Sequence, residues 1–166
     1  MLAPIIWSAV WKRRHEAALI LFGVAAASDA IDGYLARKLG SATPSGAYLD
    51  PIADKLLLSG IYLMLAAIGS LPWWLVGLIL GRDLVILIGA LVVLLITRAR
   101  TFPPSVWGKA STLFQILTAT AFLARNATHS QWLERVSALL IWPTAVLTLW
   151  SGLHYCWRGI RLVLPD

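Results

Sequence analysis

The chain has 166 residues, of which 59% are hydrophobic and 13% are charged, and its mean hydropathy is +0.77. Soluble globular domains carry roughly twice this share of charged residues, so the composition excludes an ordinary soluble protein and favours a membrane protein. The formal net charge of +6 indicates attraction to anionic lipid headgroups. No nucleic-acid-binding motif or soluble basic domain is present, so nucleic acid is not expected as a partner.

Apolar stretches separated by short polar segments predict helices that cross a bilayer. Five of them are near the roughly 20 residues that a spanning helix requires. Residues 1–11 are too short to cross alone, and we interpret them as the second half of a first helix whose beginning is missing. We therefore expect an all-α, polytopic membrane bundle of about six transmembrane helices, the first truncated, in a single domain over residues 1–166. The five full spans are 16–38, 46–68, 72–96, 106–124 and 131–157.

Lysine and arginine residues near the span ends indicate the orientation, since cytoplasmic loops are enriched in them. If the spans alternate, one side collects more of these residues than the other, and we expect it to face the cytoplasm. Lys12, Arg13 and Arg14 lie in a loop on the opposite side and depart from this rule. The basic residues on the predicted cytoplasmic side are Arg37, Lys38, Arg98, Arg100, Lys109, Arg158 and Arg161.

Four of the eight acidic residues fall within one strongly apolar stretch. Asp29 and Asp32 form an i, i+3 pair, and Asp50 and Asp54 form an i, i+4 pair, so each pair shares one face of a helix. A short connection makes the two helices antiparallel and can bring the four carboxylates together. Such anions in a low-dielectric setting need cationic compensation, and oxygen-rich clusters suit Mg²⁺ or Mn²⁺ ahead of Zn²⁺. The alternative is that the acids cap the helices and form salt bridges.

The residues around these acids resemble the signature of the CDP-alcohol phosphatidyltransferases, Asp-x2-Asp-Gly-x2-Ala-Arg-x8-Gly-x3-Asp-x3-Asp. All eight fixed positions match without an insertion, and the general hydropathy pattern extends the resemblance over nearly the whole chain. The resemblance implies transfer of a phosphatidyl group from CDP-diacylglycerol to an alcohol, with release of CMP. It also implies a homodimer, and we expect it in the bacterial inner (cytoplasmic) membrane with its active site facing the cytoplasm. The matching residues are Asp29, Asp32, Gly33, Ala36, Arg37, Gly46, Asp50 and Asp54.

By the same resemblance, the four carboxylates hold a two-metal site for Mg²⁺ or Mn²⁺. Asp29, Asp32 and Asp50 are implied as metal ligands, and Asp54 as a ligand that also acts as the general base on the acceptor hydroxyl. The small residues of the signature have an alternative role in close helix packing, and Arg37 has one as a positive-inside anchor. The residues implied in CDP binding are Asp29, Gly33, Ala36, Arg37 and Gly46.

Polar residues at membrane depth outside the signature are candidates for the acceptor pocket. Arg82 and Asp83 interrupt an apolar span, and intramembrane charges usually face a cavity or a partner. The run Gly108-Lys-x2-Thr-x2-Gln looks like one in the phosphatidylglycerophosphate synthase and cardiolipin synthase branches of the family. A structural ion pair and interhelical polar contacts are the respective alternatives. The acceptor-binding candidates are Arg82, Asp83, Arg98, Arg100, Lys109, Thr112 and Gln115.

The same run favours a glycerol-type alcohol as the acceptor. Arg82-Asp83, followed by apolar residues, resembles the eukaryote-type cardiolipin synthases, so we favour phosphatidylglycerol as the acceptor. Glycerol-3-phosphate is the alternative, since its synthases typically carry Arg-Glu and a second arginine at this place. A different class, a non-catalytic divalent-cation transporter or scaffold, would not need the spacing of Gly33, Ala36-Arg37 and Gly46. We therefore expect an enzyme.

Overall fold

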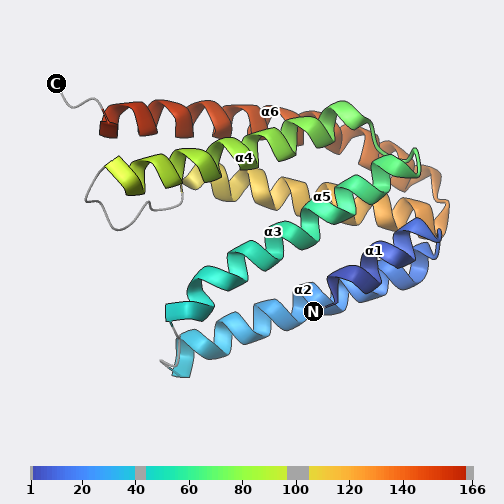
Figure 1. Ribbon diagram of the computed structural model, residues 1–166. Coiled ribbons are helices and arrows are strands. Elements are labelled where there is room, and N and C mark those ends of the chain that lie inside the picture. Colours follow the sequence, from blue (N-terminus) through green and yellow to red (C-terminus); the bar gives the residue numbers. More distant parts are fainter. Residues whose placement is uncertain (1, 40–43, 97–104, 164–166) are drawn as a thin grey trace. The chain divides into compact units, whose positions relative to one another are not determined.

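The computed structural model describes residues 2–39, 44–96 and 105–163, with side chains except at 29–30, 32–37, 39, 44–53, 90–96, 159–160 and 162–163. Regular structure in these ranges is α-helical throughout, which confirms the predicted all-α fold (Figure 1). The helices are α1 (Ala3–Trp11), α2 (His15–Leu39), α3 (Pro44–Ala67), α4 (Trp73–Ile96), α5 (Val106–Thr128) and α6 (Gln131–Val163).

The observed helices begin close to the predicted spans, and two of them, α5 and α6, extend a turn or more beyond the predicted ends. Helix α5 continues past residue 124 to Thr128, and α6 continues past residue 157 to Val163. Polar side chains stabilise the added turn of α5, because Asn126 Nδ2 donates to Ser70 Oγ at 2.9 Å and Arg125 Nη2 donates to the Ser70 carbonyl at 3.4 Å. The apolar pattern alone therefore underestimates the length of these helices.

One segment among the described residues, Gln131–Arg158, is long and apolar enough to cross a membrane by its length and composition. The apolar helical segment His15–Ser28 is shorter. The prediction that the protein is helical is confirmed, whereas the predicted number of membrane crossings stays a prediction.

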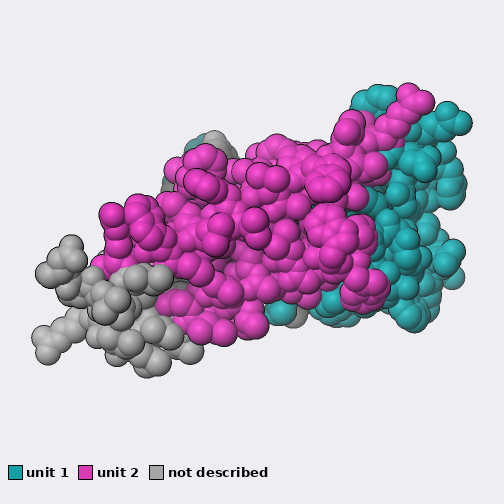
Figure 2. Space-filling view, turned by 90° about the horizontal axis from the view of Figure 1, so that it is seen from above, with its two compact units in different colours: residues 1–71, 119–134 teal, residues 72–118, 135–166 magenta. Residues whose placement is uncertain are grey.

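The chain divides into two compact units, which Figure 2 colours separately. Unit 1 consists of residues 1–71 and 119–134, and unit 2 consists of residues 72–118 and 135–166. Helices α5 and α6 each contribute residues to both units. The single domain expected over residues 1–166 stays a prediction.

Unit 1 contains the contacts of the short helix α1 with α2 and α3. Trp7 Nε1 donates a hydrogen bond to the Leu57 carbonyl of α3 at 3.2 Å. Gly60, one turn further along α3, leaves the space that the indole ring occupies, because a Cβ atom at this position would overlap the ring. Ile6 and Val10 of α1 are fully buried on the same unit, so α1 is a packed element of it.

Two helices of unit 1 end in the same hydrogen-bonding motif. At the end of α3, Ser70 N–H donates to the Leu65 carbonyl and Gly69 N–H donates to the Ala66 carbonyl, both at 2.9 Å, with Gly69 at φ 77°. This is a Schellman motif, in which a left-handed residue follows the helix and is usually glycine. At the end of α1 the same two bonds are made by Arg14 and Arg13, with Arg13 at φ 56°.

Candidate functional site

The eight signature residues lie on two consecutive helices of unit 1. Five of them fall in α2 and the other three, Gly46, Asp50 and Asp54, fall in α3, which turns back from the end of α2 (Figure 1). Both acid pairs are therefore on helical backbone, and their spacing places each pair on one helical face. The predicted residues whose side chains lie outside the described part are Asp29, Asp32, Gly33, Ala36, Arg37, Gly46 and Asp50.

Asp54 is the signature acid whose side chain the structure describes. It is exposed and has an interaction partner. Among the described side chains, no group of three or more His, Cys, Asp or Glu residues could hold a metal ion, but three of the four signature acids are not in that set. The metal site stays a prediction that rests on the helical placement of the acids.

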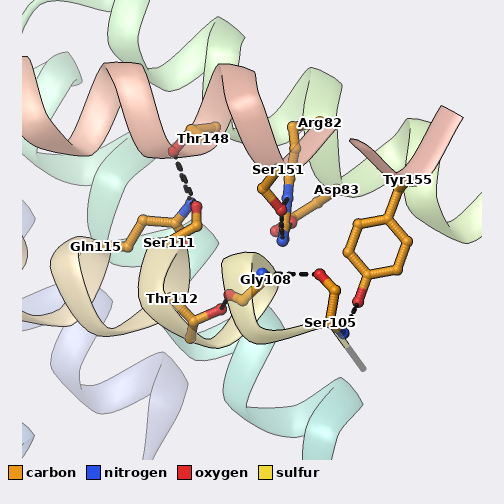
Figure 3. Close-up of polar contacts among 10 residues, drawn as sticks. All are labelled: Arg82, Asp83, Ser105, Gly108, Ser111, Thr112, Gln115, Thr148, Ser151 and Tyr155. Carbon is orange, nitrogen blue, oxygen red and sulfur yellow. Dashed lines mark hydrogen bonds and ion pairs between the residues drawn. The ribbon is translucent and has the colours of Figure 1, made fainter. Parts of the chain in front are cut away.

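Unit 2 holds a buried arginine that the sequence singled out. Arg82 of α4 is 7% exposed, and its Nη1 forms an ion pair with Asp83 Oδ1 at 2.7 Å. Its Nη2 and Nε donate to Ser151 Oγ of α6 at 2.6 and 3.3 Å (Figure 3). The guanidinium carbon also lies 5.9 Å from the centre of the Tyr155 ring, within the range of a cation–π interaction. These contacts hold the guanidinium of Arg82 in place between α4 and α6.

Tyr155 of α6 also holds the beginning of α5. The Ser105 backbone N–H donates to the Tyr155 hydroxyl at 2.8 Å, and Ser105 Oγ accepts the Gly108 N–H at 3.0 Å as the N-cap of α5 (Figure 3). A Cβ atom at Gly108 would lie 3.1 Å from the Tyr155 hydroxyl and 3.3 Å from Arg82 Nη2. Glycine at position 108 thus allows α4, α5 and α6 to approach one another closely at this polar cluster.

Small polar side chains join α5 and α6 within unit 2. Thr118 and Thr144 share a hydrogen bond at 2.7 Å, and Ser111 and Thr148 share one at 3.2 Å. Gln115 Nε2 donates to Thr148 Oγ1 at 3.2 Å and to Ser111 Oγ at 3.3 Å. All five residues are buried, so these hydrogen bonds satisfy polar groups that would otherwise destabilise an apolar interior.

The predicted acceptor-binding residues have different surroundings. Lys109 is exposed near the start of α5. Thr112 is half-buried and donates to the Gly108 carbonyl of its own helix at 3.1 Å. The contacts of Gln115 favour the alternative of interhelical packing over a direct acceptor role. Arg98 and Arg100 lie outside the described residues.

The sequence analysis missed the polar residues of α6 that complete this cluster. The sequence contains a pattern that could have identified them. Thr144, Thr148 and Ser151 of α6 lie at positions i, i+4 and i+7. Ser111, Gln115 and Thr118 of α5 have the same spacing. Matching polar stripes on two apolar helices predict an interhelical hydrogen-bonded contact.

The all-α fold and the signature on two consecutive helices together indicate a class of protein: enzymes that act on alcohols linked to cytidine diphosphate. Residues 1–150 match the model of the CDP-alcohol phosphatidyltransferase family. The chain belongs to this family of membrane transferases, which use CDP-diacylglycerol in phospholipid biosynthesis.

Similar proteins come from several bacteria. The chain is 35% identical to the "Probable phosphatidylglycerophosphate synthase" of Mycobacterium tuberculosis over 152 residues, covering 89% of the chain and 69% of that protein. It is 32% identical over 170 residues to the CDP-diacylglycerol–glycerol-3-phosphate 3-phosphatidyltransferase of Bacillus subtilis, covering 97% of the chain and 87% of that protein. The identity to the Aquifex aeolicus protein of the same name is 31% over 171 residues, covering 100% and 93%.

Proposed function

We propose that the protein transfers the phosphatidyl group of CDP-diacylglycerol to glycerol-3-phosphate and releases CMP. The observation that carries this proposal is the set of relatives named for this reaction, which match the chain over nearly its whole length. They favour glycerol-3-phosphate over phosphatidylglycerol, the acceptor that the sequence analysis favoured. Arg82-Asp83 remains the one feature that supports phosphatidylglycerol, so cardiolipin synthesis is the second candidate.

Within this proposal, Asp29, Asp32, Asp50 and Asp54 hold two divalent cations, Mg²⁺ or Mn²⁺. The donor set fits such ions, because it consists of carboxylates at i, i+3 and i, i+4 positions on the helical backbones of α2 and α3. Bound cations would neutralise the diphosphate and the departing CMP. Asp54, exposed on α3, accepts the proton of the attacking acceptor hydroxyl.

The remaining signature residues bind the cytidine nucleotide in this proposal. Gly33, Ala36 and Gly46 leave room for its close approach, and Arg37 pairs with its phosphate. Glycerol-3-phosphate is itself a phosphate anion, so the acceptor site requires cations. The candidates are the exposed Lys109, the buried Arg82 and the predicted Arg98 and Arg100.

We also propose that helices α2 to α6 cross the bilayer and that the protein is a homodimer. Each of these helices has 23 to 33 residues, enough for one crossing. Basic residues favour a cytoplasmic position for the ends of α2 and α4 and the start of α5. This orientation supports an active site that opens to the cytoplasm, where soluble glycerol-3-phosphate is available.

Identification of the product tests the choice of acceptor. The protein, purified in detergent, is incubated with CDP-diacylglycerol, Mg²⁺ and either glycerol-3-phosphate or phosphatidylglycerol, and the lipid products are identified by mass spectrometry. We expect phosphatidylglycerophosphate from glycerol-3-phosphate and no cardiolipin from phosphatidylglycerol. Formation of cardiolipin alone would replace the proposal with the second candidate, and no product with either acceptor would contradict both.

A further inference from the structure

Three basic residues come together in unit 1 at the end of α2 that is remote from the signature acids. His15 begins α2, Arg13 lies in the preceding turn, and His129 follows α5. Figure 1 shows the α1–α2 turn and the end of α5 at the same end of unit 1. In keeping with this, Arg13 and His129 both act electrostatically on His15 and lower its pKa, after the larger effect of burial. The 14 residues from His15 to Asp29 correspond to about 21 Å along the axis of α2.

Two of these residues adopt a backbone conformation that disfavours them. Arg13 has φ 56° and His129 has φ 52°, and they are the non-glycine residues with positive φ in the described part of the chain. Left-handed backbone is unfavourable for residues with a Cβ atom, whereas glycine adopts it readily. Gly69 occupies the corresponding place in the motif that ends α3. Glycine could therefore replace arginine and histidine at these two positions without backbone strain.

The surroundings of Arg13, His15 and His129 contain more basic than acidic side chains, and one polar atom there, Nδ1 of His15, has no hydrogen-bond partner in the described part of the chain. Lys12, Arg13 and Arg14 are exposed, and in the described part of the chain no ion pair involves their side chains. Nδ1 of His15 is buried and has no hydrogen-bond partner among the described residues. Glu16, which follows on α2, is exposed and is the nearest acid in sequence. A ligand for this cluster would be an anion that accepts several hydrogen bonds.

Exposed tryptophans suggest where this anion comes from. Trp11 is 59% exposed beside Lys12, and Trp132 is 68% exposed three residues after His129. Tryptophan is enriched at the level of lipid headgroups, where its ring is apolar and its N–H is wet. Basic residues at that level attract anionic lipids.

We propose that Arg13, His15 and His129 bind the phosphate group of an anionic phospholipid headgroup, at the membrane surface opposite the active site. The proposal rests on the membrane-spanning arrangement proposed above and not on the reaction, so its failure would leave the proposed transfer reaction intact. A bound headgroup would contact both the α1–α2 turn and the end of α5, and would thereby stabilise unit 1.

Thermal unfolding of the full chain tests this site. The protein in phosphate-free, non-ionic detergent receives phosphatidylserine, phosphatidylcholine or inorganic phosphate, and the unfolding temperature is recorded. Phosphatidylserine is neither substrate nor product of the proposed reaction. We expect it to raise the unfolding temperature of the wild type more than phosphatidylcholine does, with little effect of inorganic phosphate.

Glycine variants separate lipid binding from folding. Arg13→Gly and His129→Gly remove the side chains and relieve the left-handed backbone, so without lipid both variants should unfold at or above the wild-type temperature. With phosphatidylserine, both should lose the extra shift. Lys38→Ala, which removes one positive charge at the other end of α2, should retain it.

Two results would overturn the proposal. In one, the glycine variants keep the full phosphatidylserine shift, which would show that the cluster does not bind the headgroup. In the other, inorganic phosphate alone reproduces the shift and the glycine variants lose it, which would identify a soluble phosphate as the ligand in place of a lipid.

Discussion

Ser151 shows how one small side chain can maintain a buried charge. Its hydroxyl accepts from two nitrogens of Arg82, while Asp83 Oδ1 accepts from the third and compensates the guanidinium charge. The side chains of this ion pair are 5% and 16% exposed. A buried guanidinium without partners costs much more free energy than an exposed one, so Ser151 and Asp83 together permit an arginine in this apolar helix. The sequence identified Arg82 and Asp83, but Ser151 lies 69 residues away and only the fold brings it to Arg82.

Ser151→Ala should destabilise the protein by about 1–3 kcal/mol, because it leaves two buried donors of Arg82 without their acceptor. Thermal unfolding in detergent measures the loss. Ser8→Ala is the matched control, since the Ser8 hydroxyl is exposed and donates only to the Ile5 carbonyl of its own helix. Equal unfolding temperatures for the two variants would show that the contact with Arg82 contributes nothing to stability.

The lowered pKa of His15 predicts how the stability of the protein depends on pH. Burial, then Arg13 and His129, lower its pKa below 6.5 in the folded protein. The unfolded chain therefore binds more protons in the interval below pH 6.5, and stability is lost as the pH falls through that interval and is fully present above it. In His15→Gln, the unfolding temperature should depend less on pH between pH 7.5 and 5. An unchanged pH dependence would mean that His15 titrates normally.

The positions of the helices could largely be predicted from the sequence. Long apolar stretches interrupted by polar turns allow few alternatives to helices, so the predicted spans and the observed helices nearly coincide. The end of α1 was predicted at residue 11, where it lies, but the end of α5 was less predictable, because histidine stands where glycine normally marks a helix end. The docking of α1 on α3 depends on Trp7 and Gly60, which are far apart in sequence and carry no local signal.

Gly60→Ala should destabilise the protein by about 1–3 kcal/mol, because the added methyl group would overlap the Trp7 ring and displace α1. Gly23→Ala is the opposite case in the same unit, since apart from the adjacent residues and the nearby backbone of α2 no atom lies within 4 Å of the added Cβ. Alanine there should stabilise α2 by about 0.5–1 kcal/mol through its helix propensity. Thermal unfolding of both variants checks the sign, and a stabilised Gly60→Ala would contradict the observed docking of α1.

In the whole molecule, unit 1 carries the family signature on α2 and α3, and unit 2 carries the polar cluster around Arg82. The placement of the signature acids on two helices could be predicted from the sequence, because long apolar stretches on either side of a short polar segment predict two helices. The partners of the acceptor candidates could not, since they depend on which faces of α4, α5 and α6 meet. We propose that the signature acids of unit 1 perform the cation-dependent phosphatidyl transfer.

The most direct test is the rate of CMP release from CDP-diacylglycerol and glycerol-3-phosphate in the presence of Mg²⁺, compared between the wild type and Asp54→Asn. Loss of the general base should lower the rate by about 100-fold or more. Glu16→Gln, an exposed acid at the far end of α2, should keep the wild-type rate. A folded Asp54→Asn variant that releases CMP at the wild-type rate would contradict the account.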